Sequence, residues 1–594
     1  MGGQVLQGQP GAGGSTEPVR QERVGDVLVL VLAYPPVNAL GQMVRAGLMA
    51  GLARAQAEDV RAVVIMGEGR GFSAGADIAE FGRPTLAPVF GAVMARIEGL
   101  GKPVIAAISG MALGGGCELA LAAHYRIAEA KAVIGLPEVS LGILPGAGGT
   151  QRLPRLIGAE AALRLMLTGV PVGAAEALAL GLVDQVVEGD LLEAALALAR
   201  QGPAVRRTGE AWAGMRDMAA FRAAVTAARA GLDRILPAPG RIVDCVEAAA
   251  LLPLAQGLEM ERVAFEDLVM TPEAAGLRYA FFSERKAFGV AGAMAKGVSI
   301  GRIGVWGADE QTSDLCGQAL AAGLSVALCD PDRGRLVAAL ERIAGRQEAS
   351  VANGAMTEAA REAEWMRLTS TLAVDPLAGV DLVLMAPGME DLGGAVPVAA
   401  VGGLVPGVDA AISVAGASGL AEMALRGDGG AAAGLLVVLA RRVQWRLVIG
   451  SGVELALRTA LAEAEVALEA EGIAAATIVA ALAACGLGAG VPAGAMPVGG
   501  AGIVALCLAA LAAEGARMLA DGRALRPLDI DVVAVQAGLM PRWQGGPMYQ
   551  ADRLGLLVLR RDLRARAEAV FAVDPLIDGL IADGKGFASL NGGA

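Results

Sequence analysis

The first third of the chain alternates short β-branched apolar runs with stretches of helical periodicity. Three apolar runs and two helical stretches make up this pattern: VLVLVLAY at 27–34, a helix at 43–58, AVVIMG at 62–67, a helix at 92–100 and PVIAAISG at 103–110. Short buried strands that alternate with helices are typical of a parallel α/β fold. We therefore predict an α/β core here.

The pattern changes twice further along the chain. Long helical stretches replace the strands, and a strand, turn, helix, strand unit then begins with RIGVWG at 302 and continues to SVALCD at 325. After 441 we expect helices only, in two units that echo each other. The predicted organisation is a flexible tail at 1–20, an α/β core at 21–200, a helical extension and linker at 201–297, a second α/β domain at 298–440, and helical repeats at 441–500 and 501–594.

Composition and charge narrow the classes of partner. The 594 residues suit about four folding units, and 55% hydrophobic residues exclude a disordered protein. Apolar stretches such as 501–513 are shorter than the roughly 18 residues that a membrane crossing needs. A net charge of −12 gives no general field that would attract nucleic acid or anionic lipid. We therefore expect neither nucleic acid nor a membrane as a partner.

Cysteine and histidine restrict the chemistry further. The six cysteines form no CxxC pair and no metal-ligand spacing, and the chain does not start with a secretory signal pattern. These features predict reduced thiols, no metal site and a cytoplasmic location. His124 is the only histidine, so any mechanism that needs an imidazole must use it. It lies in no catalytic motif, and we expect a structural role for it.

Three segments of the first domain carry candidate chemistry: GFSAGADIAEF at 71–81, GMALGGGCELALAAHYRIA at 110–128, and LPEVSLGILPGAGGTQRLPRLIG at 136–158. Glycine and alanine runs leave backbone N–H groups open to an oxygen that becomes negative during a reaction. Glu118 and Glu138 supply two carboxylates that can divide the roles of acid and base.

These segments resemble the crotonase, or enoyl-CoA hydratase, superfamily. The domain order, the FFSERKA connector at 281–287 and PRWQGGPM at 541–548 resemble the multifunctional fatty-acid oxidation proteins, which fuse a hydratase to an NAD-dependent 3-hydroxyacyl-CoA dehydrogenase. The resemblance implies an α/β fold class with a ββα-repeat crotonase domain, a linker helix, a Rossmann-like domain and two all-α repeat domains.

The resemblance also implies roles for individual residues. It assigns an oxyanion hole to the amides of Ala76 and Gly115, catalysis to Glu118 and Glu138, and positioning of the catalytic water to Gly146. The substrate would be an acyl-CoA thioester that carries its own CoA moiety, with no further cofactor required. Members that keep both acids can also shift a 3-enoyl double bond, so a side isomerase activity is implied.

The dehydrogenase half departs from the family pattern. A dinucleotide loop needs G-x-G-x-x-G, but 307–312 reads GADEQT, so Gly307 remains while Asp309 and Thr312 replace the second and third glycines. The Asp309 carboxylate would repel the anionic pyrophosphate of a dinucleotide. Two like charges about 4 Å apart cost roughly 1 to 4 kcal/mol, depending on whether the effective dielectric is that of water or of a protein surface. The family's catalytic histidine has no counterpart after His124. Asp330 stays where the family would bind the ribose, and we interpret it as a relic of a lost NAD site.

Three functional hypotheses follow. The leading one is an enoyl-CoA hydratase that adds water across the 2,3 double bond of a trans-2-enoyl-CoA, with an inactive dehydrogenase-like half. The second keeps both activities in a bifunctional hydratase and dehydrogenase. The third, of another class, is a non-catalytic acyl-CoA-binding scaffold. The resemblance leaves self-association and pairing with a thiolase open as assemblies.

Overall fold

The computed structural model describes residues 17–592, except 81–85, 233–234, 391–395 and 416–418. Most of the tail that we predict at 1–20 therefore lies outside the described residues. The chain divides into two compact units, Met1–Arg278 and Tyr279–Ala594, each of which is described separately below.

A six-stranded sheet forms the centre of the first unit, in the order β1-β2-β3-β4-β6-β9. Its strands are β1 (Val19–Val24), β2 (Val27–Leu32), β3 (Ala62–Gly67), β4 (Val104–Ile108), β6 (Tyr125–Glu129) and β9 (Gln185–Val187). Only the β1–β2 pair is antiparallel. All six residues of β2 are buried, because layers cover both faces of the sheet, and this explains its unbroken apolar run.

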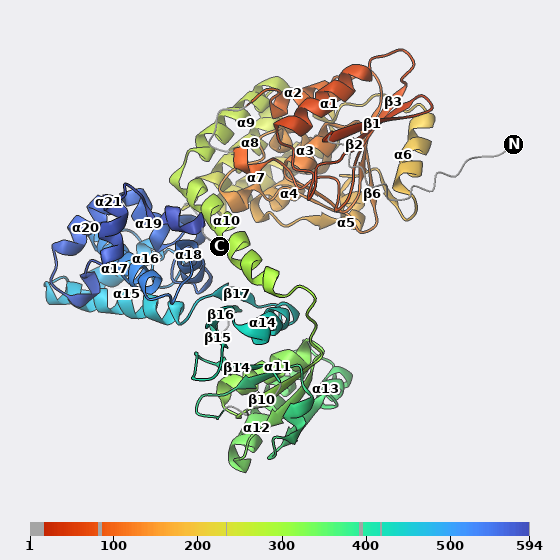
Figure 1. The fold of residues 1–594 in the computed structure, drawn as a ribbon. Coiled ribbons are helices and arrows are strands. Elements are labelled where there is room, and N and C mark those ends of the chain that lie inside the picture. Colours follow the sequence, from red (N-terminus) through yellow and green to blue (C-terminus); the bar gives the residue numbers. More distant parts are fainter. Residues whose placement is uncertain (1–16, 81–85, 233–234, 391–395, 416–418, 593–594) are drawn as a thin grey trace. The chain divides into compact units, whose positions relative to one another are not determined.

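Helices cover the two faces. On one face α6 (Leu191–Arg200) contacts β3, β4 and β6, and its Leu196 belongs to the same core cluster as Val29 and Val64. On the other face Leu30 contacts α1 (Gln42–Arg54) at Gly51. Figure 1 shows α1 to α4 on the side of the sheet opposite α6. The remaining helices of this layer are α2 (Phe90–Glu98), α3 (Gly115–Ala122) and α4 (Gly149–Thr168), and α5 (Ala174–Leu180) contacts β7, β8 and β9.

A smaller three-stranded sheet places the loops that carry the glycine motifs. It contains β5 (Met111–Leu113), β7 (Val133–Gly135) and β8 (Val172–Gly173). Because α3 begins directly after β5, and the 3₁₀ turn η2 (Glu138–Leu141) follows β7, the parallel pairing of β5 with β7 brings the GGGCE and LPE motifs together.

The helical extension contains α7 (Met218–Ala230), α8 (Pro237–Leu251), α9 (Leu254–Val269) and α10 (Pro272–Met294). Both α8 and α9 contact α4, so the extension packs directly on the helix that begins at the PGAGG motif. The division between the two units falls within α10, between Arg278 and Tyr279.

An eight-stranded sheet opens the second unit, in the order β12-β11-β10-β13-β14-β15-β16-β17. Its strands are β10 (Arg302–Trp306), β11 (Ser325–Cys329), β12 (Leu368–Thr371), β13 (Leu382–Met385), β14 (Val398–Val401), β15 (Ala410–Ala415), β16 (Leu420–Leu425) and β17 (Arg446–Ile449). The first six are parallel and follow the doubly wound order of dinucleotide-binding domains. Its helices are α11 (Glu310–Ala321), α12 (Arg333–Ala352), α13 (Glu358–Trp365) and α14 (Gly430–Arg442).

One boundary differs from our expectation. We predict no strand after 441, but β17 follows α14 and pairs in parallel with β16. The run RLVI that forms β17 is short, and the helical sequences on either side of it hide its β-branched signal. The second sheet therefore continues past the boundary that we place at 440.

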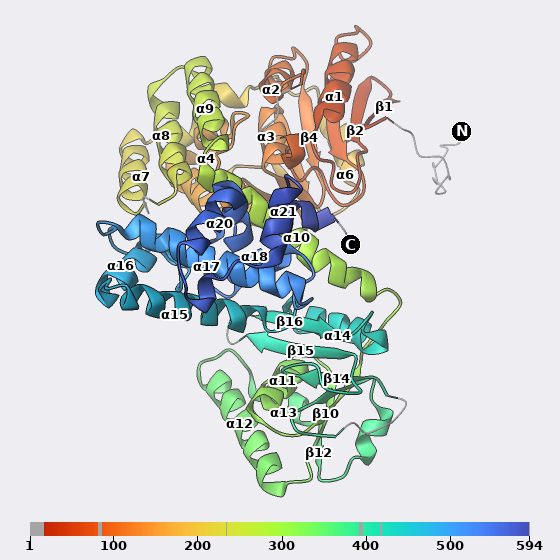
Figure 2. The same cartoon turned by 60° about the vertical axis from the view of Figure 1, so that its left-hand side comes forward.

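Helices fill the rest of the second unit and pack around α17, as Figure 2 shows. They are α15 (Val453–Ala470), α16 (Ala475–Cys485), α17 (Gly500–Ala520), α18 (Pro527–Gln536), α19 (Pro547–Leu554), α20 (Leu556–Arg564) and α21 (Pro575–Ala582). By length and apolar composition α17 could cross a membrane, yet 56% of its apolar window is buried inside the structure. Its buried residues belong to the core of this unit, which is the environment of a core helix.

The single histidine connects two elements of the first unit. His124 is fully buried, its Nδ1 accepts the N–H of Val104 at 3.0 Å, and its Nε2 lies 3.1 Å from the carbonyl oxygen of Glu98, to which it donates. Burial lowers the pKa of the imidazole. His124 is therefore a neutral residue that joins the start of β4 to the end of α2.

We predict that His124→Leu destabilises the first unit without a direct effect on chemistry. At pH 7.5 the free energy of unfolding should fall by about 1 to 3 kcal/mol, because the Val104 N–H loses its acceptor. Below about pH 6.5 the unfolded wild-type chain takes up a proton that the folded state does not, so the deficit should shrink at pH 5.5. Denaturant unfolding at both pH values measures it. An equal deficit at both would contradict a neutral buried His124.

Candidate active site

Two backbone amides meet where the first two glycine motifs converge. Ala76 lies in the loop after β3, and Gly115 is the first residue of α3. A Cβ added to Gly115 would lie 3.1 Å from the amide nitrogen of Ala76, so the two residues are in contact. Gly114, with φ of +54°, forms the turn that opens α3. Within the described part of the chain, neither amide donates to a backbone carbonyl, which leaves both available to an oxygen.

Glu118 is a buried carboxylate on the first turn of α3. Its Oε1 accepts the N–H of Ala147 at 2.7 Å and that of Gly149 at 2.8 Å. Burial raises the pKa of Glu118, whereas these two amides and the Arg152 guanidinium lower it. The two donors thus favour the ionised form in a site that otherwise opposes charge.

Glu138 occupies a different environment. It begins η2 and is 9% exposed, and its Oε1 lies 3.1 Å from the position that a Cβ on Gly114 would take. Its buried Oε2 has no hydrogen-bond partner among the described residues. Burial, and then the charge of Glu118, raise the pKa of Glu138 well above its ordinary value. Only its own backbone N–H lowers this pKa, whereas Glu118 has two amide donors and a guanidinium, so Glu138 retains its proton more readily than Glu118.

A third carboxylate, which the sequence analysis misses, faces the same turn. Glu261 lies on α9 and is 1% exposed. Its Oε1 accepts the N–H of Gly148 at 2.6 Å, while Oε2 accepts the N–H of Thr150 at 2.9 Å and the hydroxyl of Thr150. Burial and the charge of Glu118 raise the pKa of Glu261 to about 8.

A sequence signal for Glu261 exists, but it is weak. Gly257, Glu261, Ala264 and Leu268 are the buried residues of α9, at the spacing of one helical face. An acid on the apolar face of an amphipathic helix is unusual. The segment LEMERVAFEDL carries four acids in eleven residues, however, and no motif distinguishes the buried one.

Arg152 stabilises the turn at 147–150 by hydrogen bonds. It is 2% exposed and donates to Glu98 Oε2 at 2.8 Å and to the carbonyl of Ala147 at 3.1 Å. Gly148 has φ of +103°, and a Cβ there would overlap the Arg152 guanidinium. The close approach of Arg152 therefore requires a glycine at position 148.

Two aromatic rings border the site. The Phe265 ring of α9 packs against Gly146 so closely that a Cβ on this glycine would lie 2.5 Å from it. The Phe90 ring of α2 packs in the same way against Gly115, at 3.1 Å, and Arg45 lies over that ring. From the sequence we expect the acyl pocket wall to include the segment around 81–90, of which residues 81–85 lie outside the described residues.

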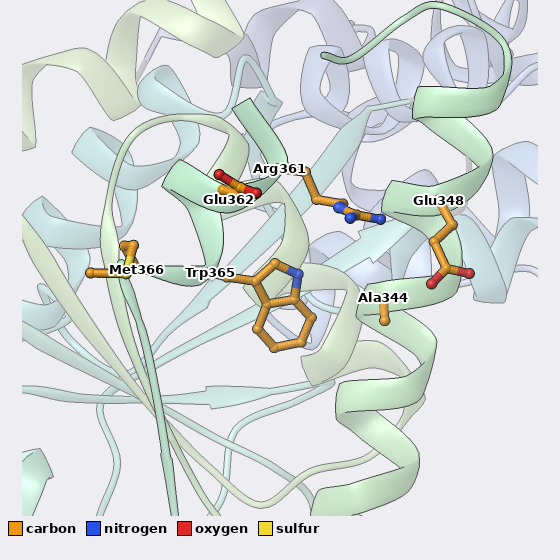
Figure 3. A pocket seen from close by; sticks show the side chains of 6 residues that line it. All are labelled: Ala344, Glu348, Arg361, Glu362, Trp365 and Met366. Carbon is orange, nitrogen blue, oxygen red and sulfur yellow. The ribbon is translucent and has the colours of Figure 1, made fainter. Parts of the chain in front are cut away.

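A cavity of about 570 Å³ lies in the second unit between α12 and α13 (Figure 3). It is lined by Ala344, Glu348, Arg361, Glu362, Trp365 and Met366. It lies beside helices that follow β11 and precede β12, rather than at the edge between β10 and β13, where doubly wound folds bind nucleotides.

The polar groups at that edge form contacts within the chain. Asp309 stands where the second glycine of the loop should be, and its side chain caps α11 by accepting the N–H of Thr312 at 2.7 Å. This N–H is one that would face a pyrophosphate. A Cβ on Gly307 would lie 2.8 Å from Met389 Cγ, so Met389 packs directly against the backbone of the loop.

Asp330 is also engaged internally. It is fully buried, its Oδ2 accepts the N–H of Ala308 at 2.7 Å, and its Oδ1 accepts the N–H of Asp332 and pairs with Arg335 at 3.1 Å. Both oxygens therefore contact the loop and the start of α12.

Comparisons with known proteins find similarity mainly in the first unit. Residues 22–211 match the family described as enoyl-CoA hydratase/isomerase. A peroxisomal bifunctional enzyme from Danio rerio is 45% identical over 275 residues, which cover 44% of this chain and 37% of the relative. The peroxisomal bifunctional enzyme from Homo sapiens is 37% identical over 379 residues, which cover 61% of this chain and 52% of the relative.

A bacterial relative shows the same pattern. The fatty acid oxidation complex subunit alpha from Shewanella frigidimarina is 42% identical over 258 residues, which cover 40% of this chain and 36% of the relative. The chain thus spans about half the length of these curated relatives, or less.

The predicted fold class is confirmed: a crotonase domain comes first, a parallel sheet of Rossmann-like order follows, and helices close the chain. Residues 22–211 thus match the enoyl-CoA hydratase/isomerase family, and the chain as a whole is similar to part of the multifunctional fatty-acid oxidation proteins.

Proposed function

We propose that this protein is an enoyl-CoA hydratase that adds water across the 2,3 double bond of a trans-2-enoyl-CoA. One observation carries the proposal: the two buried carboxylates differ in their hydrogen bonds. Glu118 accepts two amides, whereas Oε2 of Glu138 has no partner among the described residues. Such a pair divides base and acid roles in one site.

The proposed reaction assigns one step to each group. Ionised Glu118 removes a proton from water as the water oxygen bonds to C3 of the enoyl thioester. The double-bond electrons move toward the thioester carbonyl, and the amides of Ala76 and Gly115 stabilise the enolate oxygen. Protonated Glu138 then donates its proton to C2. One such amide contributes on the order of 3 kcal/mol to transition-state stabilisation. The product is a 3-hydroxyacyl-CoA.

The same residues support a secondary activity. Moving a 3-enoyl double bond to the 2-position also needs an enolate stabilised by two amides and an acid–base group, so we include a side isomerase activity in the proposal. Gly146 precedes the turn that binds Glu118, and we keep its amide as the candidate that holds the water.

We further propose that the Rossmann-like half does not bind NAD. The internal contacts of Asp309 and Asp330 support this, as does the lack of any histidine in the second unit's sequence. The names of the eukaryotic relatives favour the bifunctional alternative, and a binding measurement separates the two. Those names also carry the word peroxisomal, so the cytoplasmic location stays a prediction.

Replacing Glu138 with glutamine tests the acid. We expect Glu138→Gln to lower kcat for hydration by about 10²- to 10⁴-fold, because the proton donor to C2 is lost. The melting temperature should not change, because no hydrogen bond of Oε2 is broken. Glu160→Gln, an exposed residue of α4, is the matched control. Full activity of Glu138→Gln would remove Glu138 from the mechanism, and thioester binding without hydration by the wild type would favour the scaffold alternative.

The pH dependence of kcat/KM should be bell-shaped. Because the pKa of Glu118 is raised from 4.5, activity should be lost on the acid side as this base gains a proton, at a pH above 4.5. The pKa of Glu138 is raised further, so activity should also be lost on the alkaline side as this acid loses its proton. The two limbs belong to the coupled pair. Steady-state rates across the pH range measure them, and a plateau that persists to high pH would show that no protonated acid is needed.

Calorimetric titration of the full chain with NAD tests the second unit. We expect no saturable binding at millimolar NAD, because Asp309 occupies the helix terminus and adds negative charge beside the pyrophosphate position. Micromolar binding would instead support the bifunctional hypothesis.

A further inference from the structure

Glu261 is a buried acid that the proposed mechanism leaves without a role. It reaches the site from α9, which lies in the helical extension at 201–297 rather than in the predicted α/β core. The titratable and charged groups around it are Glu118, Glu138, Arg152 and Cys245. An acid with two acidic neighbours carries an electrostatic cost, so its presence calls for an explanation beyond packing.

Glu261 and Glu118 share one turn in strict alternation. The N–H groups of Ala147 and Gly149 point to Glu118, and those of Gly148 and Thr150 point to Glu261. Two carboxylates thus accept hydrogen bonds from alternate N–H groups of four consecutive residues. Any rotation of this turn that breaks the contacts with Glu261 also displaces the two donors of Glu118.

Both oxygens of Glu261 are committed to the turn. Oε1 accepts from Gly148, and Oε2 accepts from the backbone and the hydroxyl of Thr150. Gln151 in turn donates to the Thr150 hydroxyl and to the carbonyl of Cys245 on α8, which extends the network into the helical extension. This geometry suits a group that holds backbone in place, rather than one that reacts with substrate.

We propose that Glu261 is a positioning residue for hydration: it holds the 147–150 turn so that two amides stay directed at the base Glu118. This inference rests on the proposed hydratase function. It makes α9 part of the machinery, so the α/β core at 21–200 alone lacks a component of its own active site.

The test compares three variants of the full-length protein with the wild type. Glu261→Ala removes both acceptors, and Glu261→Gln keeps one carbonyl oxygen for the Gly148 N–H. Glu259→Ala is the matched control, because Glu259 lies on the same helix and pairs with Arg262 on its exposed side. Hydration of crotonyl-CoA is measured as kcat and KM over a range of pH, alongside melting temperatures.

We expect Glu261→Ala to lower kcat by about 10- to 100-fold while KM changes less than about twofold, because the base is misplaced but no substrate contact is lost. Its acid limb should move to higher pH by about half a unit or more, since Glu118 loses amides that favour its ionised form. Glu261→Gln keeps one of the two acceptors, so its kcat and its acid limb should lie clearly between those of Glu261→Ala and the wild type, and Glu259→Ala should match the wild type.

Other outcomes overturn the inference. Glu261→Ala with wild-type kcat, or with a reduced kcat and an unmoved acid limb, would mean that the residue serves folding alone. A limb that moves to lower pH would assign Glu261 a charge effect instead of a positioning one. If Glu261→Ala does not fold, Glu261→Gln decides, since a wild-type acid limb and wild-type kcat in it would refute the need for both acceptors. A wild-type protein that hydrates no enoyl-CoA would refute the proposed function itself, and the inference with it.

Discussion

The active site depends on how a few N–H donors are shared among three buried carboxylates. A buried carboxylate is costly unless donors satisfy it, and here the turn at 147–150 gives two amides to Glu118 and two to Glu261. Oε2 of Glu138 receives none from the described residues. This unequal distribution can keep one acid ionised and another protonated within one small site.

In the second unit, acidic side chains also accept backbone N–H groups, but there they occupy donors that a ligand would otherwise use. In a dinucleotide fold the N–H groups at the start of the helix after the first strand remain open for a pyrophosphate. Here Asp309 and Thr312 form a reciprocal capping box at that helix, and such caps stabilise a helix by typically about 1 kcal/mol. Asp330 holds the loop from the other side. These internal contacts occupy N–H donors that a dinucleotide would need, and they support our proposal that this half does not bind NAD.

The sequence predicted the parts of the site that lie in contiguous motifs. Ala76, Gly115, Glu118 and Glu138 belong to glycine-rich segments whose spacing is specific, and the structure brings these segments together through β5 and β7. Glu261 could not be found in this way, because it lies 111 residues beyond Thr150 and only the packing of α9 on α4 directs it inward. The same applies to β17, a short run whose strand character depends on pairing with β16. Local patterns thus predict the candidate site residues, while tertiary contacts between distant elements determine which residues support them.

The most direct test of this account is the fate of an enoyl-CoA incubated with the full-length protein and NAD in ¹⁸O-labelled water, followed by mass spectrometry. The account predicts that 3-hydroxyacyl-CoA accumulates with one solvent-derived oxygen and that no 3-ketoacyl-CoA forms. Recovery of unchanged enoyl-CoA would contradict the hydratase assignment, and formation of 3-ketoacyl-CoA would contradict the inactive second half.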